Sequence, residues 1–195
     1  AMASSQAFSA ENQFNLATQA LRQPGSTFKT FALTEAVRQG MNPYTTLYGS
    51  KKLDFVDDQY GPIDVSTYSN TYRGAIPVAS ALLSSDNSVF QQLTLDVGPD
   101  KVIQTAYDMG VPEERELPDV ASIGLGSGEV TPLDMATAYA PLSNGGFRVE
   151  ARSGATGIHA NVPAARRCPT RRVPRRRPGW SARRSPARRS CRWRC

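Results

Sequence analysis

A serine and a lysine lie three residues apart in the stretch RQPGSTFKTF, Arg22 to Phe31. Residues three apart share one face of a helix, so the side chains of Ser26 and Lys29 can meet there. A serine hydroxyl is a poor nucleophile until a neighbouring base removes its proton. The pair therefore indicates an activated serine. The plainer alternative is that Ser26 caps the helix and Lys29 lies on a solvated face.

Two further stretches follow in order. The first is the triplet Ser85-Asp86-Asn87, and the second is SIGLGSGEVTPLDMATAYAPLSNGG, residues 122–146. A Ser-Asp-Asn triplet alone is more often a turn or a helix cap. The glycines at 124–128 lack the Gly-Lys-Ser/Thr that completes a phosphate-binding loop. Ser-x-x-Lys together with Ser-Asp-Asn is, however, a signature of penicillin-recognising serine enzymes.

These three stretches resemble the transpeptidase domain of class A, bifunctional penicillin-binding proteins, over about residues 1–150. The resemblance implies an α/β (α+β) fold of the penicillin-binding protein and serine β-lactamase type, incomplete here and with its mostly helical part present. It also implies a D,D-transpeptidase that cross-links peptidoglycan stem peptides through an acyl-enzyme at D-Ala-D-Ala. β-Lactams are then expected as inhibitors, and no cofactor or metal is expected.

The resemblance also assigns roles to individual residues. Ser26 would attack the D-Ala-D-Ala carbonyl, and Lys29 would act as general base, which requires a lowered pKa. Ser85 would relay a proton to the leaving amine, and Asn87 would hold Lys29. The residues expected to contact substrate are Gly25, Asn87, Gly126 and Ser127.

The family's third motif, Lys-Thr/Ser-Gly, has no match in this chain. No lysine follows Lys101, and Arg152–Gly154 comes too soon after the preceding stretch to be its equivalent. The strand that carries this motif supplies a second oxyanion donor and a cation for the substrate carboxylate. We therefore expect the chain as written not to be a competent transpeptidase.

Two other functions compete with this interpretation. A class A β-lactamase shares the first two motifs but needs a glutamate that activates water. The stretch EERELPD, Glu113 to Asp119, resembles that glutamate loop, but Pro118 stands where an asparagine is required. The second alternative is binding of nucleic acid by the arginine-rich end of the chain, which would be non-specific and weakened by salt.

Charge divides the chain into two parts. Residues 1–151 hold all 17 acidic residues and nine basic ones, a net charge of −8. Residues 152–195 hold fourteen arginines, all three cysteines and no acidic residue, a net charge of +14. Arginine, proline, alanine, cysteine and tryptophan without lysine are typical of a GC-rich gene translated out of frame. We therefore expect 151–195 to be a disordered tail and 1–150 to be a partial transpeptidase domain.

The chain shows no run of 18 apolar residues and no leader sequence. Its opening, AMASSQAF, indicates a segment cut from a larger protein. The resemblance implies that this parent protein is membrane-anchored and acts at the extracytoplasmic face of the bacterial plasma membrane.

The elements that must position these motifs can also be predicted. Residues 25–40 favour a helix that ends at Gly40, and residues 53–56 favour a strand. Residues 75–98 favour two helical segments that break at Ser-Asp-Asn. Residues 98–110 favour a short helix, and Thr131 caps one more helix. The apolar stripe expected on the first helix consists of Phe28, Phe31, Ala32, Ala36 and Val37.

Overall fold

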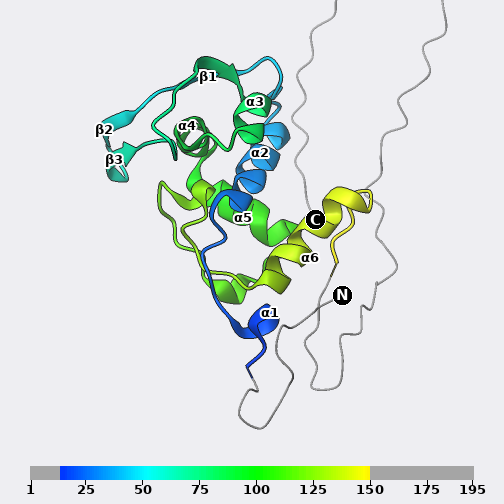
Figure 1. The fold of residues 1–195 in the computed structure, drawn as a ribbon. Coiled ribbons are helices and arrows are strands. Elements are labelled where there is room, and N and C mark those ends of the chain that lie inside the picture. The colour runs from blue at the N-terminus through cyan, green and yellow to red at the C-terminus, as the bar shows by residue number, and fades with distance from the viewer. Residues whose placement is uncertain (1–13, 150–195) are drawn as a thin grey trace, which may run out of the picture. The chain divides into compact units, whose positions relative to one another are not determined.

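The computed structural model describes residues 14–149, in which helices surround a core and two small antiparallel sheets flank it (Figure 1). The helices are α1 Leu16–Gln19, α2 Lys29–Arg38, α3 Val78–Leu83, α4 Asn87–Val97, α5 Pro99–Met109 and α6 Pro132–Ser143. The strands are β1 Leu47–Ser50, β2 Leu53–Asp57, β3 Gly61–Val65 and β4 Gly74–Pro77. Short 3₁₀ turns are η1 Gly25–Phe28, η2 Glu113–Arg115 and η3 Ile123–Leu125. The expected tail, 151–195, lies outside the described residues.

The core forms where α2, α4 and α5 meet. The predicted stripe on the first helix is confirmed at four positions, because Phe28, Phe31, Ala32 and Ala36 are fully buried. It is wrong at Val37, which is 50% exposed. Val37 lies near the end of α2, where Arg38 and Gln39 are exposed as well. The helix ends as predicted, since Gln39 caps it and Gly40 follows with φ +92°.

The segment before the triplet differs from the prediction. Residues 75–77 were expected to be helical, but they belong to β4, which pairs antiparallel with β1. A strand pairing between segments far apart in the chain leaves little local signal, whereas Val78–Leu83 shows the expected helix. The break at Ser-Asp-Asn is confirmed, because α3 ends at Leu83 and α4 begins at Asn87.

The predicted strand at 53–56 is confirmed as β2, which forms a hairpin with β3. Leu53 and Ile63 are buried on the inner face of this hairpin, whereas Val56 is 76% exposed. Figure 1 shows the hairpin at the edge of the described part, beside α4. None of the helices in residues 14–149 is long and apolar enough to cross a bilayer.

The start of α6 is fixed by a capping box. Thr131 accepts a hydrogen bond from the backbone of Asp134, and the Asp134 carboxylate accepts one from the backbone of Thr131. Arg115 donates to the same carboxylate at 2.6 Å. The predicted cap at Thr131 is thus confirmed, and α6 is tied to the loop that follows α5.

Gly124 gives a test of this packing. A Cβ at this position would lie 1.9 Å from Thr94 Oγ1, so Gly124→Ala is expected to cost about 1–3 kcal/mol of unfolding free energy. Gly49→Ala is the matched control, because its Cβ would meet only Lys51 Cδ at 4.0 Å. Adding Thr94→Ala to the first variant should restore part of the loss. Urea unfolding measures all three, and equal midpoints for the two glycine variants would contradict this packing.

Candidate active site

The nucleophile turn, named for the role predicted for Ser26 and defined as residues 25–28, begins with a tight bend. Gly25 has φ +57°, a conformation that favours glycine, and Thr27 Oγ1 donates to the Pro24 carbonyl at 2.7 Å. Ser26 is exposed at the start of this turn. Backbone N–H groups in a first helical turn have no partner within the helix. The N–H of Ser26 is therefore placed to donate to an oxyanion.

Lys29 lies one turn further along and is only 1% exposed. Its Nζ donates to the carbonyl of Ser85 at 2.7 Å, to Ser85 Oγ at 3.0 Å and to Asn87 Oδ1 at 2.7 Å. These two partners lie 56 and 58 residues further along the chain. An ammonium group has three N–H donors, so the three acceptors satisfy it fully. The structure thus brings together Lys29, Ser85 and Asn87, as the sequence predicted.

Burial controls the charge of this amine. Loss of hydration lowers the pKa of Lys29 from 10.5 to about 8, and the negative charge of Asp86 partly opposes this shift. A lysine with such a pKa has an appreciable neutral fraction near neutral pH, and only the neutral amine can accept a proton. The lowered pKa that a general base requires is therefore present.

The triplet is shaped by its first two residues. Ser85 has φ +52°, which is uncommon for a residue other than glycine, and this conformation presents both its carbonyl and its hydroxyl to Lys29. Asp86 is buried and accepts hydrogen bonds from Ser50 Oγ at 2.6 Å, from Ser88 Oγ at 2.7 Å and from the backbone of Val89 at 3.0 Å. Burial acts to raise the pKa of Asp86, but these hydrogen bonds outweigh it and hold the pKa below its ordinary value. Asp86 thus caps α4 and ties it to β1.

Ser26 shares a cavity of about 460 Å³ with the triplet. The loop between β3 and β4 forms most of the remaining wall. Asn87 Nδ2 donates a hydrogen bond to the carbonyl of Ser66, in this loop, at 3.3 Å. This loop, residues 66–73, is the rim of the cavity. The sequence did not predict its role, although a polar run between two strands is typical of a loop that carries function. The lining residues are Ser26, Thr67, Tyr68, Ser69, Thr71, Arg73, Ser84, Ser85, Asp86 and Asn87.

The other predicted contacts lie beside the cavity. Gly126 is buried against the backbone of Gly25, where an added Cβ would lie 2.2 Å from the Gly25 carbonyl oxygen. Ser127 Oγ accepts a hydrogen bond from Ser122 Oγ at 3.1 Å. The residues that line the cavity do not include Gly25, Gly126 or Ser127. Substrate contact by these three residues stays a prediction.

The glutamates that a β-lactamase would require lie elsewhere. Glu113, Glu114 and Glu116 are exposed on and beside η2, and none of them lines the cavity that holds Ser26. The position of this stretch in the described part of the chain therefore does not favour a water-activating role.

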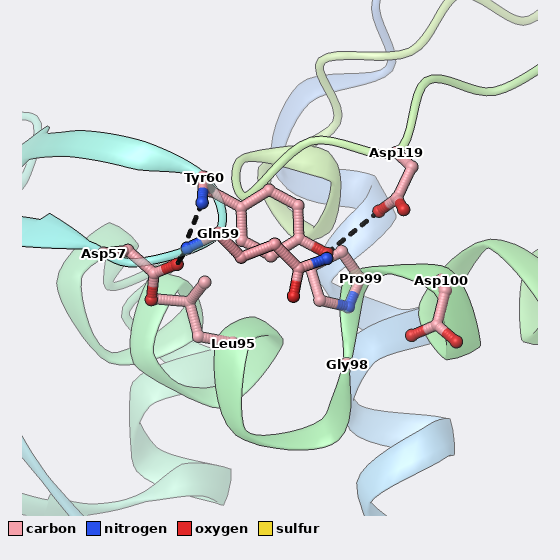
Figure 2. A pocket seen from close by; sticks show the side chains of 8 residues that line it. All are labelled: Asp57, Gln59, Tyr60, Leu95, Gly98, Pro99, Asp100 and Asp119. Carbon is pink, nitrogen blue, oxygen red and sulfur yellow. Dashed lines mark hydrogen bonds between the residues drawn. The ribbon is translucent and has the colours of Figure 1, made fainter.

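A second cavity, of about 430 Å³, has a different character (Figure 2). Its wall carries three aspartates, and Tyr60 donates to Asp119 Oδ1 at 3.1 Å. Loss of hydration and the nearby carboxylates raise the pKa of Tyr60 to about 12. This lining offers no serine hydroxyl, whereas Ser26 and Ser85 line the first cavity. The lining residues are Asp57, Gln59, Tyr60, Leu95, Gly98, Pro99, Asp100 and Asp119.

The buried amine predicts a pH dependence of stability. Between about pH 8 and pH 10.5 the unfolded chain holds a proton on Lys29 that the folded chain lacks. The free energy of unfolding therefore rises with pH across this window, on the order of 3 kcal/mol. Lys29→Met should lose this rise, whereas Lys101→Met, at an exposed position on α5, should keep it. Urea unfolding across this window measures the effect, and equal pH slopes in both variants would contradict the burial of Lys29.

Comparison with known sequences identifies the family to which this chain is similar. The family described as the penicillin binding protein transpeptidase domain matches residues 1–154. Penicillin-binding protein 1A of Pseudomonas aeruginosa is 32% identical over 162 residues, which is 78% of this chain and 20% of that protein. Penicillin-binding protein 1A of Neisseria lactamica is 39% identical over 140 residues, 70% of this chain and 17% of that protein. The chain thus spans about a fifth of these relatives.

Solved structures of penicillin-binding proteins share the fold of this chain. Penicillin-binding protein 1A from Haemophilus influenzae matches with a TM-score of 0.65 and 26% identity, over 72% of this chain and 21% of that one. PonA1 from Mycobacterium tuberculosis matches with a TM-score of 0.58 and 29% identity, over 70% and 37%. The expected mixture of helix and strand in a penicillin-binding fold is confirmed. The chain belongs to the penicillin-binding protein transpeptidase family.

Proposed function

We propose that this chain carries the nucleophile side of a peptidoglycan D,D-transpeptidase site. The observation that supports it best is the buried amine of Lys29, held by Ser85 and Asn87 beside the cavity that Ser26 lines. A solvated lysine would stay charged and could not act as a base. The four residues belong to the Ser-x-x-Lys and Ser-Asp-Asn stretches on which the resemblance to the family was based.

The reaction starts with proton transfer from Ser26 Oγ to the neutral amine of Lys29. Oγ then attacks the carbonyl carbon of the D-Ala-D-Ala bond, and the N–H of Ser26 donates to the oxyanion that forms. When the C–N bond breaks, the proton passes from Lys29 through the Ser85 hydroxyl to the leaving D-alanine. Ser26 keeps the peptide as an ester. The amine of a second stem peptide attacks this ester, which forms the cross-link and restores the hydroxyl.

A β-lactam would enter the same cavity, because its ring amide mimics the bond that is attacked. PonA1, a structural relative at 29% identity, has been solved in complex with penicillin V. Reaction of Ser26 with penicillin gives an ester in which the opened ring stays attached. Peptidoglycan as the substrate places the reaction outside the plasma membrane, so we propose an extracytoplasmic location and a membrane-anchored parent protein.

The chain as written lacks the Lys-Thr/Ser-Gly strand that faces Ser26 in the family. Removing one oxyanion donor costs about 10²–10³ in rate, and here the cation for the substrate carboxylate is missing as well. We therefore expect the isolated chain to acylate slowly. The same residues should react at a normal rate when a relative supplies that strand.

Labelling with fluorescent penicillin tests the proposal. The 195-residue chain should label at least about 10²-fold more slowly than the Pseudomonas aeruginosa relative. A chimera that carries residues 14–149 in place of the matching segment of that relative should label readily. Mass spectrometry should then find the adduct on the tryptic peptide Gln23–Lys29.

Two variants of the chimera are the controls. Ser26→Ala should abolish the adduct, and Ser143→Ala, which removes an exposed hydroxyl on α6 outside the cavity lining, should leave it unchanged. A folded chimera without an adduct, or an adduct that survives Ser26→Ala, overturns the proposed function. Rapid labelling of the isolated chain shows instead that it is competent by itself.

A further inference from the structure

The nucleophile turn has a second face, which contacts α6 rather than the cavity. Thr27 and Thr30 are three residues apart, so they share one side of the helical backbone, next to the side that carries Ser26 and Lys29. The hydroxyl of Tyr139, on α6, donates to the Thr27 carbonyl. The same hydroxyl lies 2.8 Å from Thr30 Oγ1.

The direction of both hydrogen bonds follows from the number of protons available. A tyrosine hydroxyl has one proton, and a carbonyl can only accept. Tyr139 therefore gives its proton to Thr27, and Thr30 donates to the Tyr139 oxygen. The ring of Tyr139 also packs edge-on against Phe31, with centroids 6.1 Å apart and planes at 81°. One side chain thus contacts the turn at Thr27 and the first turn of α2 at Thr30 and Phe31.

Two more contacts come from the segment that leads into α6. The backbones of Gly126 and Gly25 touch so closely that no side chain fits between them. The backbones of Val130 and Arg22 exchange hydrogen bonds of 3.0 and 3.1 Å. These contacts fix the start of the turn, while Tyr139 acts further along it, between Ser26 and the first turn of α2. The contacts at Arg22 and Gly25 thereby limit sliding of the turn at its start. The contacts of Tyr139 limit rotation of the turn about its own helical axis.

We propose that Tyr139 is a positioning residue, whose hydroxyl holds the rotation of the nucleophile turn so that Ser26 faces the cavity and Lys29 meets its three acceptors. This inference rests on the function proposed for Ser26 and Lys29. A rotation of the turn moves both side chains together, because they project from the same face. It would take Ser26 away from the substrate and bring the amine of Lys29 toward water.

Tyr139→Phe is the direct test, because it removes the hydroxyl and keeps the ring against Phe31. Tyr107→Phe is the matched control: its hydroxyl also binds a backbone group, the N–H of Leu117 at 2.9 Å, but away from the turn. The amide of Lys29 donates to the Ser26 carbonyl and reports on the turn directly. Its hydrogen exchange in the 195-residue chain should be about 2- to 10-fold faster in Tyr139→Phe than in Tyr107→Phe.

The titration of Lys29 is a second readout, which a general loss of stability would not move. The chain has four lysines, so labelled lysine gives few NMR signals, and Lys29→Met identifies the one that matters. In Tyr139→Phe the midpoint of Lys29 should rise above about 8, by about half a unit, because water reaches the amine. In Tyr107→Phe it should stay unchanged.

The inference is overturned if Tyr139→Phe matches Tyr107→Phe in both measurements. It is also overturned if exchange rises equally over all helices while the midpoint of Lys29 stays fixed, since that is a purely structural effect. Neither measurement needs a reaction at Ser26. Failure of the penicillin experiment would therefore remove the proposed function without deciding the role of Tyr139 in holding the turn.

Discussion

The buried amine of Lys29 is the constraint on which the site depends. An amine with 1% exposure can carry its charge only if protein groups replace the water that it has lost. The three acceptors come from Ser85 and Asn87, so the start of α4 must lie against the start of α2. The same arrangement lowers the pKa of the amine, because burial removes the water that would stabilise its charge. Burial of Lys29 thus disfavours the charged amine, and it provides the neutral amine that the proposed function requires.

Asp86 explains how this arrangement is held in place. Its side chain accepts hydrogen bonds from Ser50, from Ser88 and from the backbone of Val89. Ser50 in turn accepts a hydrogen bond from the backbone of Arg73, at the rim of the cavity. One carboxylate therefore connects the cap of α4, the β1–β4 sheet and the rim loop. The middle residue of the triplet acts on the scaffold, while its two neighbours act on the amine.

Local motifs could be predicted from the sequence more readily than contacts between segments far apart in the chain. Ser26, Lys29, Ser85 and Asn87 belong to short motifs whose spacing is local. The structure places Ser26, Ser85 and Asn87 in the wall of one cavity, and Lys29 donates hydrogen bonds to the last two. Helix ends marked by caps, such as Thr131, were predictable for the same reason. Strand β4 was missed, because its partner lies far away in the chain and residues 75–77 carry no alternation of their own.

Contacts between backbones are the hardest to predict, and the glycine-rich segment shows why. A glycine has no side chain. A glycine in the sequence therefore does not tell whether a ligand or another segment of backbone approaches it. At Gly126 the approaching group is the backbone of Gly25, the residue that precedes the nucleophile. Substituting any larger residue there would displace the turn and, with it, both side chains on its reactive face. The chemistry proposed for Ser26 and Lys29 therefore requires the segment at 122–146 to pack against the turn, which is a reason for the three stretches to occur together.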